Sequence, residues 1–175
     1  SVRDSVSLAN KGGGFEVLGS EPIETVGKGR SYGVELLFQQ KLSNNFYGIL
    51  AYTWFYSEFT GFDPDTYLPS VWDSRHLLSF VGGYKFKRNW ELSARYRFAG
   101  QTPYVPTDLE ATLENYPEVI LDYSRLGEEK LDVFSQLDVR LDKKWNLKNF
   151  PFDVFIEVQN LLGQDIPSPP EYGLS

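Results

Sequence analysis

The sequence predicts an all-β fold, an antiparallel up-and-down meander of about six long strands within residues 31–160. Apolar and polar residues alternate there with a period of two, which is the period of a strand. The alternating segments run for about ten residues or more, whereas strands of soluble proteins are usually about five or six residues long. The connections between the segments alternate between short and long. These three observations together predict the meander.

Residues 89–100 show this pattern most clearly. One face of the segment is wholly apolar and has an aromatic residue at each end, and it consists of Trp90, Leu92, Ala94, Tyr96 and Phe98. The opposite face carries the charged residues Glu91, Arg95 and Arg97. A tilted strand that crosses a bilayer needs about nine to eleven residues. The length of the segment therefore suits a membrane-crossing strand.

The other elements follow in order along the chain. Residues 1–30 are expected to be loop with one short strand, and residues 161–175 are expected to be a Pro-rich loop tail. The Gly-rich segments 11–14 and 26–30 lack the spacing of a phosphate-binding loop. Strands are predicted over 31–42, 46–58, 72–86, 89–100, 131–145 and 152–159.

The connections between the predicted strands sort by length. Three of them span about three to five residues, and the two between these pairs span about twelve and about thirty. Short turns at one side and long loops at the other are the signature of a transmembrane β-barrel. Trp90 and Trp145 fall beside short turns, and Trp54 and Trp72 fall beside a long loop. All four are therefore expected at strand ends, as membrane-interface aromatics.

Composition excludes several classes of protein and site. The 175 residues include no cysteine, which excludes disulfides, thiol catalysis and cysteine-based zinc sites. The net charge of −7 argues against a nucleic-acid partner. No apolar run is long enough for a transmembrane helix. Methionine is absent, so we expect a processed or excised piece of a longer chain.

The loop at 101–130 carries the candidate ligand-binding tyrosines, Tyr104, Tyr116 and Tyr123. Tyrosine rings can stack on sugars or contact peptides. The same loop is rich in acidic residues that can attract cations or basic partners, and a solvated external loop is the alternative interpretation. No two carboxylates have a spacing that predicts a glycosidase, so no catalytic residue is predicted.

No metal site or cofactor is predicted. Asp63 and Asp65 lack the remaining ligands of a calcium loop. His76 is the single histidine, and it cannot build a histidine-based metal site alone. A histidine satisfied by its neighbours at the membrane interface is the favoured interpretation.

Five segments resemble the C-terminal barrel strands of TonB-dependent outer-membrane receptors, particularly those of Bacteroidetes-type bacteria. The segments are GRSYGVELLFQQKL (29–42), YTWFYSEFTG (52–61), WDSRHLLSFVGGYKF (72–86), FAGQTPYVP (98–106) and FIEVQNLLGQ (155–164). The resemblance runs from about residue 2 to the end of the chain. It implies a barrel of about 22 strands around an N-terminal plug. Such receptors import a scarce nutrient (a siderophore-bound metal, a vitamin, a glycan or a peptide) with energy from the inner-membrane TonB complex.

The resemblance implies that residues 1–175 are a C-terminal segment of the receptor, without its plug domain and final strand. The segment would form barrel wall and extracellular loops in the bacterial outer membrane, with the short turns periplasmic, and would not be an enzyme. Its partners would be the lipid bilayer, the receptor's own plug and remaining strands, the TonB complex through the missing N-terminal region, and the imported small molecule or oligomer.

In such a barrel the lumen-facing charges would be Glu91, Arg95, Arg97, Asp138, Arg140 and Asp142. If the fourth and fifth predicted strands pair, these rows can form cross-strand ion pairs. Contact with the plug or with an anionic solute is the alternative role for these charges.

A second class of protein stays open at this point. The chain could be a β-rich surface or adhesin-type module that recognises ligands through its Tyr-bearing acidic loops. The barrel interpretation requires one continuous apolar outer face about 25 Å tall. The binding module instead requires the apolar rows to meet another sheet in a closed core.

Overall fold

A computed structural model describes residues 27–60, 63–116, 119–148 and 150–170. The short strand expected within residues 1–30 and the Gly-rich segment 11–14 lie outside the described residues. Residues 161–170 contain no strand.

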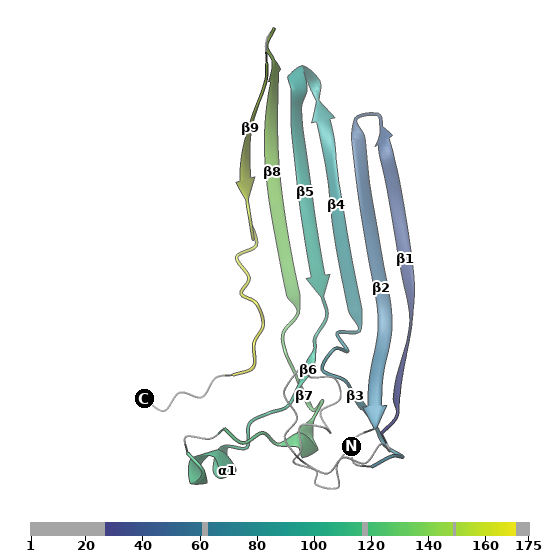
Figure 1. Ribbon diagram of the computed structural model, residues 1–175, viewed down its shortest axis with the longest axis vertical. Coiled ribbons are helices and arrows are strands. Elements are labelled where there is room, and N and C mark those ends of the chain that lie inside the picture. Colours follow the sequence, from purple (N-terminus) through teal and green to yellow (C-terminus); the bar gives the residue numbers. More distant parts are fainter. Residues whose placement is uncertain (1–26, 61–62, 117–118, 149, 171–175) are drawn as a thin grey trace.

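Six long strands form one antiparallel sheet in the order β1-β2-β4-β5-β8-β9 (Figure 1). Their bounds are β1 Gly29–Ser43, β2 Phe46–Thr60, β4 His76–Phe86, β5 Trp90–Ala99, β8 Phe134–Asn146 and β9 Pro151–Val158. Each long strand pairs with the long strands before and after it along the chain. The predicted antiparallel meander is confirmed.

The remaining elements are short. They are β3 Tyr67–Pro69, β6 Pro103–Tyr104, β7 Glu129–Lys130, α1 Leu109–Glu114 and the 3-10 turns η2 Lys87–Asn89 and η3 Tyr123–Arg125. Strand β3 pairs with the end of β2, and β6 pairs with β7 in a separate small sheet. The loop predicted at 101–130 thus has local structure of its own. Among the described residues, no helix has the length and apolar character needed to cross a membrane.

The strand predicted over 72–86 begins later than expected, at His76. Residues 72–75 instead form a turn, in which the backbone N–H of Asp73 donates to the carbonyl of Ser70 at 3.0 Å. Arg75 ends the turn with a positive φ of 62°. Non-glycine residues seldom adopt this conformation, and it cannot be continued into a strand. The alternation of apolar residues begins only after His76, so the sequence prediction placed the start of this strand too early.

Two asparagines close the first hairpin. Ser43 pairs with Phe46, which leaves Asn44 and Asn45 as a two-residue loop. Their φ values are 49° and 69°. Positive φ at both central residues defines the turn whose twist matches that of the flanking strands, and asparagine tolerates it better than most residues do. The sequence therefore specifies the first hairpin locally.

The connections lie at opposite ends of the sheet according to their length. The β1–β2, β4–β5 and β8–β9 turns lie at the upper end in Figure 1. The β2–β4 and β5–β8 connections, with β3, β6, β7 and α1, lie at the lower end. We refer to these as the short-turn end and the long-loop end.

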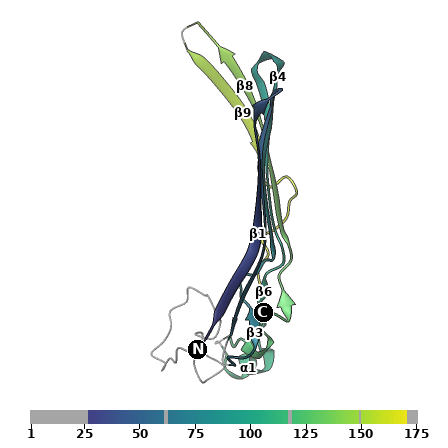
Figure 2. The ribbon, with the colours of Figure 1, turned by 90° about the vertical axis from the view of Figure 1, so that its right-hand side faces the viewer.

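The long strands form a single curved layer, which Figure 2 shows edge-on. Among the described residues, the buried apolar side chains are Pro103, Val105, Pro106 and Leu126, and all of them belong to the long-loop end. Large apolar side chains on the strands are exposed, for example Leu37 at 65% and Ile156 at 68%. The described sheet lacks the closed core that the binding-module alternative requires.

Candidate functional site

The two faces of the sheet are the candidate site, because the strand register separates apolar from polar side chains. Directly opposed residues of an antiparallel pair point to the same face. One row of opposed residues across five strands is Phe38, Leu50, Phe80, Tyr96 and Leu137. A second row, nearer the short-turn end, is Tyr84, Leu92, Leu141 and Ile156. The apolar rows of the separate strands thus merge into one continuous face, the apolar face.

The height of the apolar face matches a bilayer. Aromatic rings cluster at both its ends, level with His76 and Phe86, the first and last residues of β4. Ten residue steps separate these two positions, which corresponds to about 33 Å along a strand. At the strand tilt of about 40° that outer-membrane barrels have, this length corresponds to a height of about 25 Å, which is that of their apolar band.

Aromatic rings gather on the apolar face toward the long-loop end. Tyr32 and Tyr56 stack across β1 and β2 with centroids 5.1 Å apart, and Trp54 meets Tyr56 edge-on at 5.2 Å. Tyr52 stacks on His76, and its hydroxyl lies 2.8 Å from Nδ1 of that histidine. His76 is therefore satisfied by a neighbour on the same face.

A second aromatic cluster lies at the short-turn end. Phe86 contacts Tyr84 edge-on at 4.8 Å and is opposed by Trp90. The ammonium of Lys143 lies 5.1 Å from the Trp90 ring and 5.4 Å from the Trp145 ring. Amphipathic rings with a snorkelling lysine between them are typical of a lipid–water interface.

The four tryptophans differ in whether they lie at strand ends, where the sequence predicts them. Trp90 begins β5 and Trp145 is the penultimate residue of β8, both beside short turns. Trp72 lies in the turn before β4 and is 54% exposed. Trp54 does not lie at a strand end, because β2 continues to Thr60 where β3 extends the pairing. It is instead level with His76, the first residue of the neighbouring strand.

The opposite face, the polar face, carries a hydrogen-bonded network around Asp138. Oδ2 of this carboxylate accepts from Nε of Arg95 at 3.0 Å and lies 2.9 Å from Nη2 of the same guanidinium. Oδ1 accepts from Nε2 of Gln136 and from the backbone N–H of Asn160, both at 2.9 Å. Asp138 is 4% exposed. Because β5 pairs with β8, Arg95 and Asp138 form the expected cross-strand ion pair.

Arg97 differs from Arg95 in its partner. Its Nη2 donates to Oε1 of Gln136 at 2.8 Å, and the described residues supply no carboxylate to it. Asp138 is already saturated by other donors, and it orients the Gln136 amide so that the carbonyl oxygen faces Arg97. Arg97 therefore keeps an uncompensated positive charge on the polar face.

Arg140 pairs along its own strand rather than across to β5. It donates to Asp142 at 2.7 Å, lies 3.9 Å from Glu157 on β9, and stacks over the Phe155 ring at 3.7 Å. Side chains two apart in a strand share a face, which explains the contact with Asp142. Around Asp138 and Arg140 the polar face thus carries compensated ion pairs, whereas Arg97 and Lys85 have none among the described residues.

Glu91 is held by a tyrosine on β2. The hydroxyl of Tyr47 donates to Oε1 of Glu91 at 2.6 Å, across the intervening β4. The Tyr47 ring crosses Gly83, where an added Cβ would lie 2.5 Å from the tyrosine oxygen. Gly83 therefore provides the space that this long-range hydrogen bond needs.

The three candidate loop tyrosines have different surroundings. Tyr104 lies in β6, and its hydroxyl donates to Glu129 of β7 at 2.5 Å. Tyr116 follows α1 and is 65% exposed. Tyr123 begins η3, and its side chain lies outside the described residues. Tyr104 therefore joins β6 to β7, and Tyr116 presents its ring to solvent.

The structure contains no metal-binding cluster within the described ranges. No group of three or more histidine or carboxylate side chains is close enough there to hold an ion. The Asp63 carboxylate accepts from the Thr66 hydroxyl at 2.6 Å and from the backbone N–H of Asp65 at 3.0 Å. These hydrogen bonds lower the pKa of Asp63 below its ordinary value. Asp63 thus closes its own turn.

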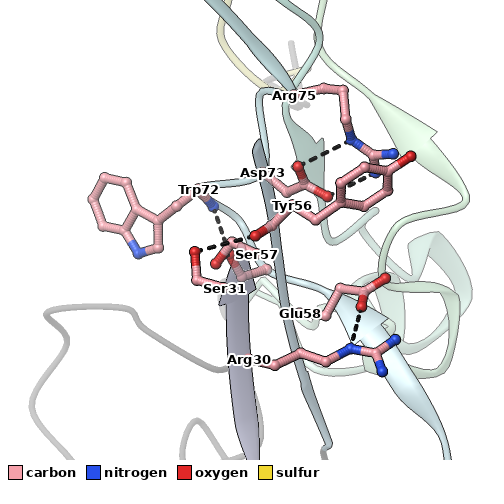
Figure 3. Close-up of polar contacts among 9 residues, drawn as sticks. Arg30, Ser31, Tyr56, Ser57, Glu58, Trp72, Asp73 and Arg75 are labelled. Carbon is pink, nitrogen blue, oxygen red and sulfur yellow. Dashed lines mark hydrogen bonds and ion pairs between the residues drawn. The ribbon is translucent and has the colours of Figure 1, made fainter. Parts of the chain in front are cut away.

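A polar cluster that the sequence pattern did not predict fixes the β2–β4 connection to the sheet (Figure 3). Ser70 bonds Ser57 through both backbone and hydroxyl, at 2.8 and 2.9 Å. Arg75 donates to the buried Asp73 at 2.8 and 3.3 Å, and its guanidinium lies 3.6 Å from the Tyr56 ring centroid. The bonds to Asp73 raise the pKa of Arg75. We call these five residues the loop anchor.

A single-layer antiparallel meander with one apolar and one polar face defines the wall of a membrane β-barrel. The family model described as "TonB dependent receptor-like, beta-barrel" matches residues 2–161, and the chain belongs to this family. The family is one of outer-membrane transport receptors rather than enzymes, and in general it is embedded in the membrane and interacts with a plug and with TonB. Searches of curated proteins and of solved structures found no match.

Proposed function

We propose that this chain forms a wall segment of a TonB-dependent receptor that imports a scarce nutrient. The apolar face contacts lipid, and the polar face lines the lumen around the receptor's plug. Residues 31–160 supply the wall strands, and the TonB complex supplies energy through a region upstream of this chain. The candidate substrates are a siderophore-bound metal, a vitamin, a glycan or a peptide.

One observation carries this proposal. The apolar rows lie on one face about 25 Å tall, and charged side chains lie on the opposite face of the same single layer. In water this arrangement would leave the apolar face exposed, without the favourable free energy that burial of apolar surface provides. Between lipid and an aqueous lumen, each face meets a medium that matches it.

The lumen side chains have distinct roles in this proposal. Glu91, Asp138, Arg140 and Asp142 are satisfied by neighbours in the wall, and Arg95 is held by Asp138. Arg97 is one of the lumen charges available to a plug carboxylate or an anionic solute. The four tryptophans mark the membrane interfaces, and Tyr104, Tyr116 and Tyr123 belong to the loop that meets substrate first.

Two consecutive residues of β2 provide a matched test of which face meets lipid. Leu50 lies on the apolar face between Phe38 and Phe80, whereas Ile49 lies on the polar face between Gln39 and Val81. All four neighbours are uncharged and lie near mid-height. We expect Leu50→Lys to destabilise the receptor in lipid by about 2–4 kcal/mol, and Ile49→Lys to change its stability little.

The measurement is denaturant unfolding of the whole receptor in bilayers, followed by tryptophan fluorescence. Equal losses for the two variants, or a larger loss for Ile49→Lys, would contradict the assignment of the faces. Both substitutions introduce lysine into the same strand, so the strand propensity of the introduced residue is the same in the two variants.

The orientation of the loops is tested separately by labelling. We propose that the long-loop end is extracellular and the short-turn end periplasmic. Cysteine is introduced at Glu110 in α1, or at Lys148 in the β8–β9 turn, in a receptor without other cysteines. An impermeant maleimide should label Glu110→Cys on intact cells, and Lys148→Cys only after the outer membrane is opened. The reverse pattern would refute this orientation.

Transport is tested with the intact receptor in cells. Uptake of labelled siderophore–iron, cobalamin, oligosaccharides and oligopeptides is compared with and without the receptor gene. Uptake that requires the receptor and stops when the inner-membrane proton gradient is dissipated would support TonB-coupled import. Receptor-dependent uptake that persists without the gradient would refute the coupling.

A further inference from the structure

A polar hollow of about 320 Å³ lies at the long-loop end. Three segments far apart in sequence line it: the turn that enters β4, the residues after β5, and the end of β7. Its polar lining residues are Asp73, Ser74, Arg75, His76, Gln101 and Lys130. The volume is within the range of small-ligand sites.

The charges around the hollow favour an anion. Arg75 and Lys130 contribute positive charge, and Asp73 is the one acidic lining residue. The Asp73 side chain is only 1% exposed, and both of its oxygens accept from Arg75. The Asp73 carboxylate is therefore already paired. The Arg75 side chain is 33% exposed, and its guanidinium, with two nitrogens bonded to Asp73, keeps further N–H donors.

Lys130 has no ion pair among the described residues. The preceding acids, Glu128 and Glu129, both bind Arg125, at 2.9 and 2.8 Å. Asp132 follows two residues later but does not line the hollow. Among the described residues, the ammonium of Lys130 is therefore the uncompensated charge at this site, in a loop that is acidic overall.

Backbone hydrogen bonds fix the lining segments to one another. The N–H of Gly100 donates to the carbonyl of His76 at 2.8 Å, and that of Leu131 to Thr102 at 2.9 Å. The first bond joins β4 to the chain after β5, and the second joins that chain to β7. The backbone segments that carry the donors are thus positioned before any ligand arrives, which lowers the entropic cost of binding.

We propose that this hollow binds an oxyanion, a phosphate or carboxylate group, with Lys130 as its principal cation and Arg75, Gln101 and Ser74 as further donors. Guanidinium, ammonium, amide and hydroxyl groups are together the donors that oxyanions accept from. The group belongs either to a soluble anion or to a lipid headgroup at the membrane surface. The inference rests on the proposed function only for its place at the extracellular end.

The test uses the whole receptor in nanodiscs, inorganic phosphate as the probe, and equilibrium dialysis at constant ionic strength. We expect saturable binding, which Lys130→Gln weakens about fivefold through loss of a charge-assisted hydrogen bond. Lys130→Arg should stay within about twofold of the wild type because it keeps the charge. Lys87→Gln, which removes an exposed lysine at the short-turn end, is the control and should bind phosphate as the wild type does.

Nanodisc composition distinguishes the two sources of the anion. If anionic phosphatidylglycerol competes with phosphate for the wild type but not for Lys130→Gln, the natural ligand is a headgroup. An unchanged phosphate Kd in anionic and in zwitterionic nanodiscs assigns the site to a soluble anion.

Absence of saturable phosphate binding would overturn the proposal, as would Lys87→Gln weakening binding as much as Lys130→Gln does. The barrel-wall proposal would survive that result, because the face and labelling tests do not involve the hollow.

Discussion

Replacing Gly83 by alanine should destabilise the barrel wall through a residue that lies on another strand. The added Cβ would lie 2.5 Å from Oη, 2.7 Å from Cζ and 2.9 Å from Cε1 of Tyr47. The flexible ring must move by several tenths of an ångström, and its 2.6 Å hydrogen bond to Glu91 then breaks.

The size of the effect follows from two opposing contributions. A hydrogen bond to a charged group contributes about 1.5–3 kcal/mol, and this one is part-buried. Alanine in a strand recovers about 0.5–1 kcal/mol relative to glycine. The net expected loss in the free energy of unfolding is therefore about 1–2 kcal/mol.

Tyr47→Phe provides the second arm of a double-mutant cycle, because it removes the hydroxyl and keeps the ring. In that background Gly83→Ala has no hydrogen bond to break, so its cost should fall by about 1 kcal/mol. Gly48→Ala is the matched control, because its added Cβ meets other atoms only at 3.4 Å or more. Denaturant unfolding of the receptor in bilayers measures all four variants and the wild type.

Two results would refute this reasoning. One is a Gly83→Ala variant as stable as the Gly48→Ala control. The other is a double variant whose loss of stability equals the sum of the losses of Gly83→Ala and Tyr47→Phe. Such additivity would mean that the added methyl group does not destabilise the wall by breaking the hydrogen bond to Glu91.

The remaining predictions concern single side chains. Asp138→Asn should lower the denaturant midpoint of unfolding, because it leaves Arg95 without a counter-charge. The control Asp153→Asn should leave the midpoint unchanged, because its partner Lys144 is exposed and 3.6 Å away. Equal midpoints for the two variants would contradict the role of the Asp138 network. The hydrogen bond from Thr66 is the largest cause that lowers the pKa of Asp63, and the bond from the Asp65 backbone is the next. The ionised carboxylate therefore stabilises its turn at any pH above the ordinary carboxyl pKa. This stabilisation is lost as the pH falls through the lower pKa of the folded state. Thr66→Val should raise that pKa in a carboxyl NMR titration, and an unchanged value would exclude the hydroxyl as its cause. Asp73→Asn should speed hydrogen exchange of the Phe55 N–H, which donates to the Arg75 carbonyl at 3.0 Å, and unchanged exchange would show that the loop anchor does not hold this edge.

The faces of the strands could be predicted from sequence because side-chain alternation is a local property. The apolar rows of the strands at 89–100 and 31–42 needed no knowledge of their neighbours. The ends of the strands were harder to predict. β4 starts at His76 because Arg75 adopts a positive φ, and nothing in its residue type signals that conformation. Trp54 does not lie at the end of β2, because β2 continues past the start of β4 and pairs with β3, which is a contact with another segment.

The polar network could be predicted only in part. The contact between Arg95 and Asp138 follows from the pairing of two recognisable strands. The donor from Asn160 does not, because it is a backbone N–H placed by the chain after β9. Tyr104 likewise required the β6–β7 pairing, which two-residue strands do not reveal in a sequence. Contacts that depend on long-range closure are therefore the ones that local pattern misses.

The absence of a closed core in the described sheet has a consequence for biogenesis. A chain whose apolar side chains have no interior to enter cannot complete folding in water, and its exposed strands would pair with those of other copies. The 15-residue β1, exposed along its whole length, would be such an edge. A sheet of this kind is therefore expected to complete its folding only where lipid covers the apolar face. Correct folding then depends on transfer of the chain into a membrane rather than on the stability of a native state in solution.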